Sequence, residues 1–432
     1  MTIHPLLFVL PAVMLLAADL AWLRAAELAE PGIPQSMGMQ TKPDTTPQDF
    51  QTIQDMQFRY IRRGFYWSAA EKVKGEYDFA EFDRIFQQAK DHGFVMVACL
   101  FSNNKLYEPD HVGGITTDAG RQGFAAYAAA MAARYKDHDV LWEIWNEPNT
   151  KTFWRKDGKG NTPEFAQEYT DLVKAVAVAM LAADPDCFIL GGSVSNYWEK
   201  SYEWTEYCFQ KGILKTGIRG WVVHPYGMKT PEEHALGHAI TRDLFVKYGA
   251  SADFPLLNTE RGFAVQKPTD NDEGWSGGSE ELAIQFQSWH FVRQIMIDQM
   301  CIVPVTIWYQ WGGAKFGFVN EGKNRPVMDA CRTLVSQLTG YRYKERIATE
   351  SDLDYLLVFE NAAGHRKIVA WTAPPPTQAP DAAKPHDLSV ALPLTGDIVT
   401  VDIYGKKSSA RTTDGKTTIA VSPAPQYLAS AK

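Results

Sequence analysis

Two glutamates that follow apolar runs are the residues of this sequence best suited to carry out chemistry. Glu147 lies in the run Leu141-Trp142-Glu143-Ile144-Trp145-Asn146-Glu147-Pro148-Asn149, and Glu260 ends the run Pro255-Leu256-Leu257-Asn258-Thr259-Glu260. A (β/α)₈ barrel presents an acid at such a strand end on its catalytic face. Two carboxylates across one cleft can cleave a glycosidic bond, since one protonates the leaving oxygen and the other attacks or activates water.

The neighbours of Glu147 favour this chemistry over a merely solvated strand end. Asn146 carries an amide that can bind a sugar hydroxyl, and Trp142 and Trp145 offer rings on which a sugar can stack. Pro148 has no backbone donor and therefore suits the end of a strand. Glu260 taken alone is equally compatible with a solvated strand end, so the prediction depends mainly on the Asn-Glu-Pro motif.

The elements that would position these residues alternate between strand and helix. Amphipathic spacing predicts helices over residues 79–89 and 164–183. Apolar strands alternating with such helices indicate a parallel sheet covered by helices. The sequence therefore predicts an α/β fold, a (β/α)₈ TIM barrel over residues 31–340. Its eight strands are expected at residues 33–39, 58–62, 94–101, 140–145, 188–192, 220–224, 254–258 and 302–308.

The pattern changes after about residue 340. Short apolar strands at residues 355–359, 367–371, 388–392 and 398–404 are separated by turn residues, and the Pro-rich stretch 373–385 reads as a long hairpin loop. This pattern predicts a small C-terminal antiparallel β-sandwich-type domain over residues 341–432. We expect it to be structural, because it offers no pair of carboxylates suited to catalysis.

The stretch Trp142 to Asn149, followed by Phe153-Trp154, resembles the clan of retaining (β/α)₈ glycoside hydrolases that carry Asn-Glu-Pro on strand four. It is most similar to glycoside hydrolase family 39 and to endoglycosidases encoded with bacterial exopolysaccharide operons, over roughly residues 34–340. The resemblance implies that Glu147 is the general acid/base, Asn146 the partner of the sugar 2-hydroxyl and Glu260 the nucleophile. The chain departs from the family at Val140 and at Arg261-Gly262-Phe263.

Other strand ends supply further candidate substrate-binding residues. The resemblance implies that Arg62 steadies the nucleophile, and a cation there would hold Glu260 ionised. His224 and Tyr226 resemble clan site residues, although a buried histidine with structural partners is the alternative for His224. Trp308 matches an aromatic that floors the sugar subsite, and a core aromatic at the barrel rim is its alternative. The predicted substrate-binding set is Asn146, Arg62, His224, Tyr226, Trp308, Trp145 and Trp311.

Composition excludes several classes of function. The chain has 432 residues, a net charge of −8 and no basic stripe, which argues against a nucleic-acid partner. Five scattered cysteines indicate neither a zinc site nor a disulfide framework. His234 and His238 lack the glutamate of a zinc-protease motif. We find no phosphate loop, metal-ligand set or Schiff-base lysine at a strand end, so no cofactor is predicted.

The N-terminus carries an apolar run at residues 5–17, followed by small residues. This length is typical of a signal peptide and short for a membrane span, although no Lys or Arg precedes the run. We predict that residues 1–30 form a signal peptide or an N-terminal membrane anchor. The protein is then periplasmic or secreted, with a tether to the inner membrane as a variant of the same prediction.

The residues together predict a retaining β-glycosidase that acts on a polysaccharide or oligosaccharide, without metal or cofactor. The similarity to exopolysaccharide enzymes favours internal cleavage. A family 5 or 10 type cellulase, mannanase or xylanase is the alternative within the same class. A catalytically silent carbohydrate-binding protein is the alternative of another class, and it would normally lack one of the two carboxylates.

Overall fold

The computed structural model describes residues 28–108, 113–155, 159–265 and 279–431. The predicted signal or anchor segment 1–30 lies outside the described residues except for its last three positions. Residues 266–278 also lie outside them. No helix in the described part of the chain combines the length and the hydropathy that a membrane crossing requires.

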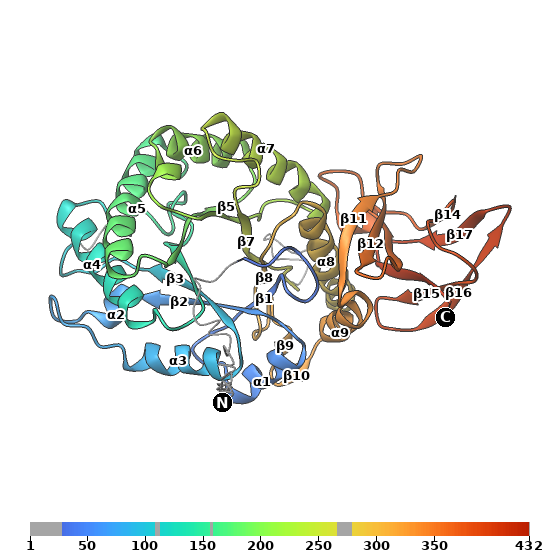
Figure 1. Cartoon of the computed structure of the whole chain (residues 1–432), viewed down its shortest axis with the longest axis horizontal. Coiled ribbons are helices and arrows are strands. Elements are labelled where there is room, and N and C mark those ends of the chain that lie inside the picture. Colours follow the sequence, from blue (N-terminus) through green and yellow to red (C-terminus); the bar gives the residue numbers. More distant parts are fainter. Residues whose placement is uncertain (1–27, 109–112, 156–158, 266–278, 432) are drawn as a thin grey trace, which may run out of the picture.

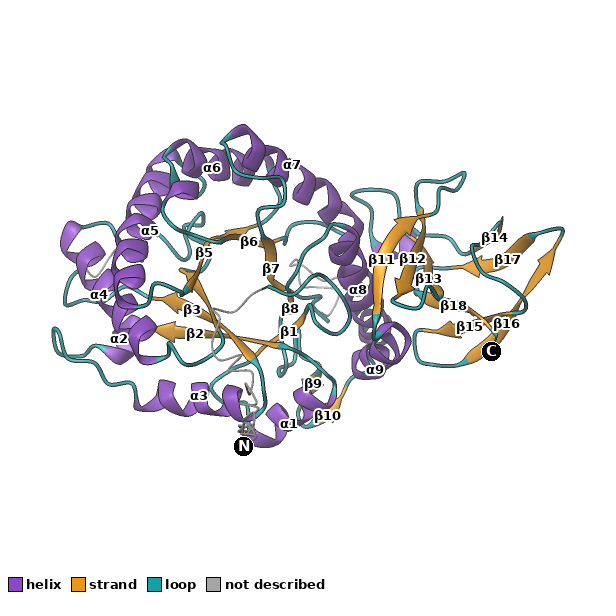
Figure 2. Ribbon diagram, viewed as in Figure 1, coloured by secondary structure: helices purple, strands orange, loops and turns teal. Residues whose placement is uncertain are grey.

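Eight parallel strands form a closed barrel, as predicted, and helices surround it (Figures 1 and 2). Pairing of Met37 with Thr306 between the first and eighth strands closes the ring. The strands are β1 (Met37–Gln40), β2 (Tyr60–Tyr66), β3 (Val95–Phe101), β4 (Val140–Ile144), β5 (Phe188–Ser195), β6 (Gly220–His224), β7 (Leu256–Arg261) and β8 (Thr306–Trp308). The helices are α1 (Pro47–Asp55), α2 (Trp67–Ala70), α3 (Ala80–Asp91), α4 (Asp118–Arg134), α5 (Pro163–Ala183), α6 (Glu199–Gln210), α7 (His234–Lys247), α8 (Glu280–Met300) and α9 (Val327–Leu338).

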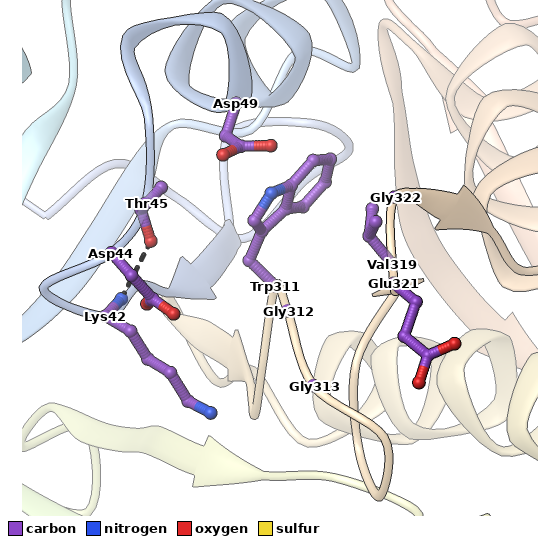
Figure 3. A pocket seen from close by; sticks show the side chains of 10 residues that line it. All are labelled: Lys42, Asp44, Thr45, Asp49, Trp311, Gly312, Gly313, Val319, Glu321 and Gly322. Carbon is purple, nitrogen blue, oxygen red and sulfur yellow. Dashed lines mark hydrogen bonds between the residues drawn. The ribbon is translucent and has the colours of Figure 1, made fainter.

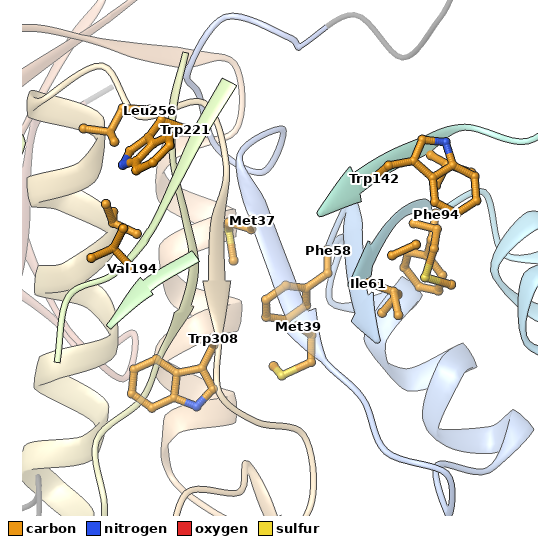
Figure 4. Packing of buried hydrophobic residues seen from close by; sticks show 14 of the residues in the cluster. Met37, Met39, Phe58, Ile61, Phe94, Trp142, Val194, Trp221, Leu256 and Trp308 are labelled. Carbon is orange, nitrogen blue, oxygen red and sulfur yellow. The ribbon is translucent and has the colours of Figure 1, made fainter. Parts of the chain in front are cut away.

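Side-chain alternation along the strands builds two apolar cores. Val95 and Val97 of β3 belong to a cluster with Leu141, Val222, Leu257 and Ile307, whereas Met96 and Ala98 belong to the larger cluster that includes the helices. Figure 4 shows part of this larger cluster, with Trp142, Trp221 and Trp308 among its buried side chains. The two packed faces fix the strands, and therefore fix the residues at their carboxyl ends.

The C-terminal part is an antiparallel β domain beside α8 and α9 (Figure 1). Its eight strands form one curled sheet in the order β11-β12-β13-β18-β15-β16-β17-β14. Side chains from both halves of the sheet, such as Leu356, Ile419 and Leu428, enclose a separate small core. The strands are β11 (Tyr341–Arg346), β12 (Asp354–Asn361), β13 (Arg366–Thr372), β14 (His386–Val390), β15 (Ile398–Asp402), β16 (Lys407–Thr413), β17 (Lys416–Val421) and β18 (Gln426–Ser430).

Several predicted boundaries shift in the structure. The first strand was expected at 33–39 but is limited to β1, because Ile33 only bridges to Thr339 beside α9. The last was expected from residue 302, yet Ile302 is 62% exposed with a positive φ, and β8 begins only at Thr306. Two short strands, β9 (Val319–Asn320) and β10 (Lys323–Asn324), form a small ribbon after β8 that was not predicted.

Candidate active site

The segment after β4 presents Glu147 at the carboxyl end of the barrel through an unusual backbone. Trp145 has a φ of 71° and Glu147 a φ of 47°, a left-handed region that residues other than glycine seldom adopt. The Trp145 N–H donates to the carbonyl of Leu100 at 2.9 Å, and the Glu147 carbonyl accepts from Thr150 N–H at 3.0 Å. These bonds hold the turn, and the Glu147 side chain keeps 12% exposure at the strand end.

Glu260 lies near the end of β7 with its side chain 14% exposed. Its Oε2 accepts a hydrogen bond from Arg62 Nη1 at 2.6 Å, and its Oε1 accepts one from the Tyr226 hydroxyl at 3.3 Å. One carboxylate oxygen of Glu260, one of Glu147 and one ring nitrogen of His224 all lie within 4.8 Å of one another. The structure thus brings together the two carboxylates that the sequence placed 113 residues apart (260 − 147).

Arg62 is the centre of the charged network beneath these carboxylates. It is 2% exposed and its guanidinium reaches four side chains: Glu260, Glu143, Gln40 at 3.0 Å and the Asn146 amide oxygen at 2.8 Å. The fork of donors on Arg suits this role, because it can bind several acceptors in one plane. Arg62 therefore ties the end of β2 to β1, β4 and β7.

His224, at the end of β6, is fully buried. Its Nδ1 lies 3.2 Å from Glu147 Oε1 and its Nε2 lies 3.1 Å from the Thr259 hydroxyl. Burial acts to lower the pKa of His224, but hydrogen bonds with Glu143 and Glu147 and the charge of Glu260 outweigh it and raise that pKa to about 9. His224 is therefore protonated at neutral pH and donates from both nitrogens.

Burial raises the pKa of Glu260, and the nearby charges of Glu147 and Glu143 add to this effect. The charges of His224 and Arg62 oppose it. Our expectation that a cation beside Glu260 would keep it ionised names the right partner, since Arg62 lowers the pKa, but burial outweighs that contribution. Glu147, His224 and Glu260 lie close enough together to bind a cation. However, Glu260 already accepts a hydrogen bond from Arg62, and the raised pKa of His224 keeps its ring protonated. We therefore assign this cluster to acid and base chemistry.

Comparison with known proteins gives the class of enzyme. The model of the cellulase family (glycosyl hydrolase family 5) matches residues 25–236. The chain is a (β/α)₈ glycoside hydrolase. A family 39 glycoside hydrolase from Bacteroides cellulosilyticus WH2 superimposes with a TM-score of 0.72 at 19% identity, covering 94% of this chain and 83% of that chain.

Two further solved structures share the fold of this glycoside hydrolase. A monomeric β-xylosidase from Caulobacter crescentus CB15 matches with a TM-score of 0.64 and 15% identity, over 95% of this chain and 98% of that chain. A family 30 subfamily 8 xylanase from Clostridium acetobutylicum matches with a TM-score of 0.60 and 12% identity, over 94% and 98%. A comparison with curated protein sequences gave no match. At these identities the structural matches show a shared fold.

The tryptophans of the glycoside hydrolase do not lie where we expected. Trp145 has no exposed surface, packs against Trp154 and donates from Nε1 to the Phe153 carbonyl at 3.1 Å. Trp142 is 2% exposed and packs near Phe86. The prediction that a sugar stacks on these two rings is wrong, because the helices around the barrel cover them. Trp308 is 1% exposed and packs edge-on against Phe291, so its ring is also part of the core.

A hollow of about 270 Å³ lies beside the β1 and β8 ends of the glycoside hydrolase (Figure 3). Trp311 forms one wall, Lys42 and Asp44 line a second, and Glu321 lines a third. The Trp311 N–H donates to the carbonyl of Gln40, whose side chain binds Arg62. Trp311 is therefore linked through Gln40 to the charged network, and it lines the hollow although it is only 4% exposed.

Sequence reasoning missed four residues that complete the glycoside hydrolase site: Glu143, Ser193, Thr259 and Gln40. Glu143 is fully buried and binds Arg62 through both oxygens, at 2.7 and 2.9 Å. A signal for it was present, because alternation along β4 puts Leu141 and Glu143 on one face and Trp142 and Ile144 on the other. A charged residue on the inward face of a strand needs a partner, and Arg62 supplies it.

All five cysteines are free thiols, four of them buried. Burial raises the pKa of Cys208 and Cys331 far above the usual range, so these thiols are apolar core residues. His238 is likewise structural, since it binds the Tyr197 hydroxyl at 2.7 Å and Asp298 at 2.9 Å.

Proposed function

We propose that this glycoside hydrolase is a retaining β-glycosidase, with Glu260 as nucleophile and Glu147 as general acid/base. The observation that carries the proposal is the approach of their oxygens to within 4.8 Å of each other. Retaining enzymes hold the two carboxyl groups about 5 to 5.5 Å apart, whereas inverting enzymes leave about 6.5 to 9.5 Å for a water molecule. An approach of two carboxylate oxygens to within 4.8 Å supports the closer, retaining arrangement.

In the first step, Glu260 attacks the anomeric carbon while Glu147 gives its proton to the leaving oxygen, so that one C–O bond forms as the glycosidic C–O bond breaks. In the second step, Glu147, now ionised, takes a proton from water, and the resulting hydroxide displaces Glu260 from the anomeric carbon. Arg62 and Tyr226 donate to the two oxygens of Glu260, and they orient the nucleophile. His224 donates to Glu147 and orients the acid.

Asn146 is proposed to bind the sugar 2-hydroxyl. Its amide oxygen accepts from Arg62 Nη2 at 2.8 Å, which turns the amide NH₂ away from Arg62. That NH₂ is then available to donate to a hydroxyl next to the anomeric carbon. Hydrogen bonds at this position strengthen in the transition state of glycoside hydrolysis.

The substrate is proposed to be a polysaccharide or oligosaccharide cleaved within the chain. The hollow lined by Trp311 and Lys42 follows the ends of β1 and β8 and offers space for further sugar units of a polymer. Cellulase, mannanase or xylanase activity is the second candidate, and the match to the family 5 model over residues 25–236 favours it. The β-xylosidase and xylanase that share the fold make xylan a substrate to include in any test.

The test is hydrolysis of a panel of polysaccharides, including cellulose, xylan, mannan, β-glucans and crude bacterial exopolysaccharides, with released products identified by mass spectrometry. NMR of the first product should show the anomeric configuration of the substrate. An inverted first product excludes the double displacement, and release of monosaccharide alone excludes internal cleavage. Glu260→Gln, which removes the nucleophile with little change of shape, is the control for contaminating activity.

We also propose that the protein acts outside the cytoplasm, because an apolar segment of signal-peptide length stands at residues 5–17. Fractionation of producing cells, followed by N-terminal sequencing of the mature protein, tests this. Full-length protein in the cytoplasmic fraction contradicts it.

A further inference from the structure

Glu143 is a fully buried carboxylate to which the proposed reaction gives no role. Burying an ionised carboxylate is costly unless charged and hydrogen-bonding partners surround it. Glu143 has both kinds of partner, and each of them contacts a residue of the catalytic pair. It therefore lies one layer beneath the reacting groups, at the inward-facing position of β4.

The first partner is Arg62. Glu143 accepts from Nε at 2.9 Å and from Nη2 at 2.7 Å, a bidentate arrangement that fixes the plane of the guanidinium. The Nη1 edge of the same plane then points at Glu260 Oε2, and Nη2 also reaches Asn146. Without Glu143, Nε would lose its acceptor, and the fork would be held only through Nη1, by Gln40 and Glu260, and through Nη2, by Asn146.

The second partner is His224. Its Nε2 lies 3.6 Å from Glu143 Oε1, on the opposite side of the ring from the Nδ1 that contacts Glu147. The Ser193 hydroxyl donates to the same Glu143 oxygen and also lies 3.5 Å from His224 Nε2. Glu143 thus faces the proton-bearing nitrogen of His224 both directly and through a hydroxyl.

An irregularity in β5 supplies that hydroxyl. The register between β5 and β6 shifts between Gly191 and Val194, and Ser193 has a φ of 54°. The Tyr169 hydroxyl accepts from the Gly192 N–H at 2.8 Å and donates to the Ile144 carbonyl at 2.8 Å, which holds the bulge against β4. Bulges of this kind re-aim side chains next to active sites. Here the bulge aims Ser193 at Glu143.

We propose that Glu143 is a positioning residue of this glycosidase, which orients Arg62 toward Glu260 and keeps His224 as a donor to Glu147. This inference rests on the proposed function for its effect on turnover. Its effect on His224 stands on the structure of the free protein and does not depend on any substrate.

The charges around His224 show why Glu143 matters. Glu143, Glu147 and Glu260 favour its protonated form, Arg62 opposes it, and the Thr259 and Ser193 hydroxyls are neutral. Burial by itself disfavours the charge on His224. The pKa of Glu143 is held well below its usual range, because the charge of Arg62 and hydrogen bonds from His224 and Arg62 overcome burial. Glu143 is therefore ionised at neutral pH and supplies a negative charge beside His224.

The experiment is Glu143→Gln, which keeps the shape and removes the charge. Histidine ¹⁵N NMR of the free protein, assigned with His224→Asn, should show the pKa of His224 falling by about 1 to 3. Turnover at its optimum should fall on the order of 100-fold, because Arg62 and Glu260 lose their alignment. Glu108→Gln removes a carboxylate that is 3% exposed and binds Thr116 and Thr117 near α4, and it should change none of these.

An unchanged His224 titration in folded Glu143→Gln overturns the proposal, even if turnover falls, because a loss of packing alone would lower turnover without moving a pKa. If Glu143→Gln does not fold, the wild-type titration decides: a His224 that is neutral at pH 7 overturns the proposal. Absence of any glycosidase activity in the wild type would refute the proposed function, while the His224 titration would still report on Glu143.

Discussion

Breaking the buried ion pair at the boundary of barrel and β domain should destabilise the protein strongly. Arg293 of α8 donates to Glu232 at 2.5 and 2.7 Å, and their side chains are only 2% and 7% exposed. Trp371 of β13 donates to the same carboxylate at 2.7 Å. Arg293→Met would leave the Glu232 charge buried without its cation. Losing one partner of such a pair costs about 3 to 5 kcal/mol, so we expect the free energy of unfolding to fall by that amount at pH 7.

The loss of stability in Arg293→Met should depend on pH. Burial raises the pKa of Glu232, but Arg293 and hydrogen bonds lower it below its usual value. In the wild type the pair therefore contributes stability above the unfolded pKa of about 4.3, and this is lost as pH falls through the folded pKa. In Arg293→Met, burial acts without the cation and raises the pKa. The loss of stability should then shrink as the pH falls and Glu232 takes up a proton.

Urea unfolding followed by tryptophan fluorescence at pH 7 and pH 5 measures these changes. The double variant Arg293→Met/Glu232→Gln should recover most of the loss, because replacing both charges of a buried pair is often nearly neutral. Arg332→Met on α9 is the matched control, since its partner Asp329 is 65% exposed, and it should change stability by about 1 kcal/mol or less. A loss below about 1 kcal/mol for Arg293→Met, or a double variant as unstable as the single, would refute the reasoning.

Three further predictions concern the reaction, its pH range and the β domain. Glu260→Ala should abolish cleavage of every substrate. Glu147→Ala should still cleave aryl glycosides whose leaving group needs no proton, and added azide should make this cleavage faster. Equal losses of activity on activated and unactivated substrates in Glu147→Ala contradict these roles. The pKa of His224 is raised to about 9, against 6.5 in the unfolded chain. This shift contributes about 3 kcal/mol of stability, which is fully present below pH 6.5 and lost as pH rises through about 9. Urea unfolding from pH 6 to 10 should show this fall in the wild type and a smaller one in His224→Gln. Residues 341–432 expressed alone should be unfolded or should not bind polysaccharide in a pull-down, because the domain shares buried contacts such as Trp371 with the barrel; tight binding by the fragment would make it a sugar-binding module.

The strands of the barrel and the acids at their ends were predictable because both signals are local. Runs such as residues 94–101 and 220–224 are apolar throughout, as parallel strands covered on both faces must be. Arg62, Glu147 and Glu260 then follow from position, since carboxyl ends of parallel strands meet on one face. The local apolar pattern did not give the boundaries of β1 and β8. Ile302, for example, is apolar but is exposed at the turn after α8.

The contacts of the site could not be predicted, because they join residues far apart in the chain. Arg62 meets Glu143, 81 positions away, and His224 lies 162 positions from Arg62. Trp145 is next to the Asn-Glu-Pro motif in sequence, but its ring does not lie at the site. The backbone of Trp145 has a positive φ, and its side chain is buried between β4 and the helices. Only Glu143 carried a usable signal, an acid on the inward face of an otherwise apolar strand.

The site combines two energetically unfavourable features, buried charges and residues with positive φ. Three carboxylates and two cations lie close together at the carboxyl ends of the barrel strands, and the segment that carries Glu147 holds two residues with positive φ. Buried charges need partners at fixed distances, and Glu147 lies 3.2 Å from His224. The turn that carries Glu147 has a cost on the order of 1 to 3 kcal/mol for each residue with positive φ. The ion pairs of Arg62 and His224 then hold the carboxylate in the place to which the turn directs it, so the strain and the buried charges persist together.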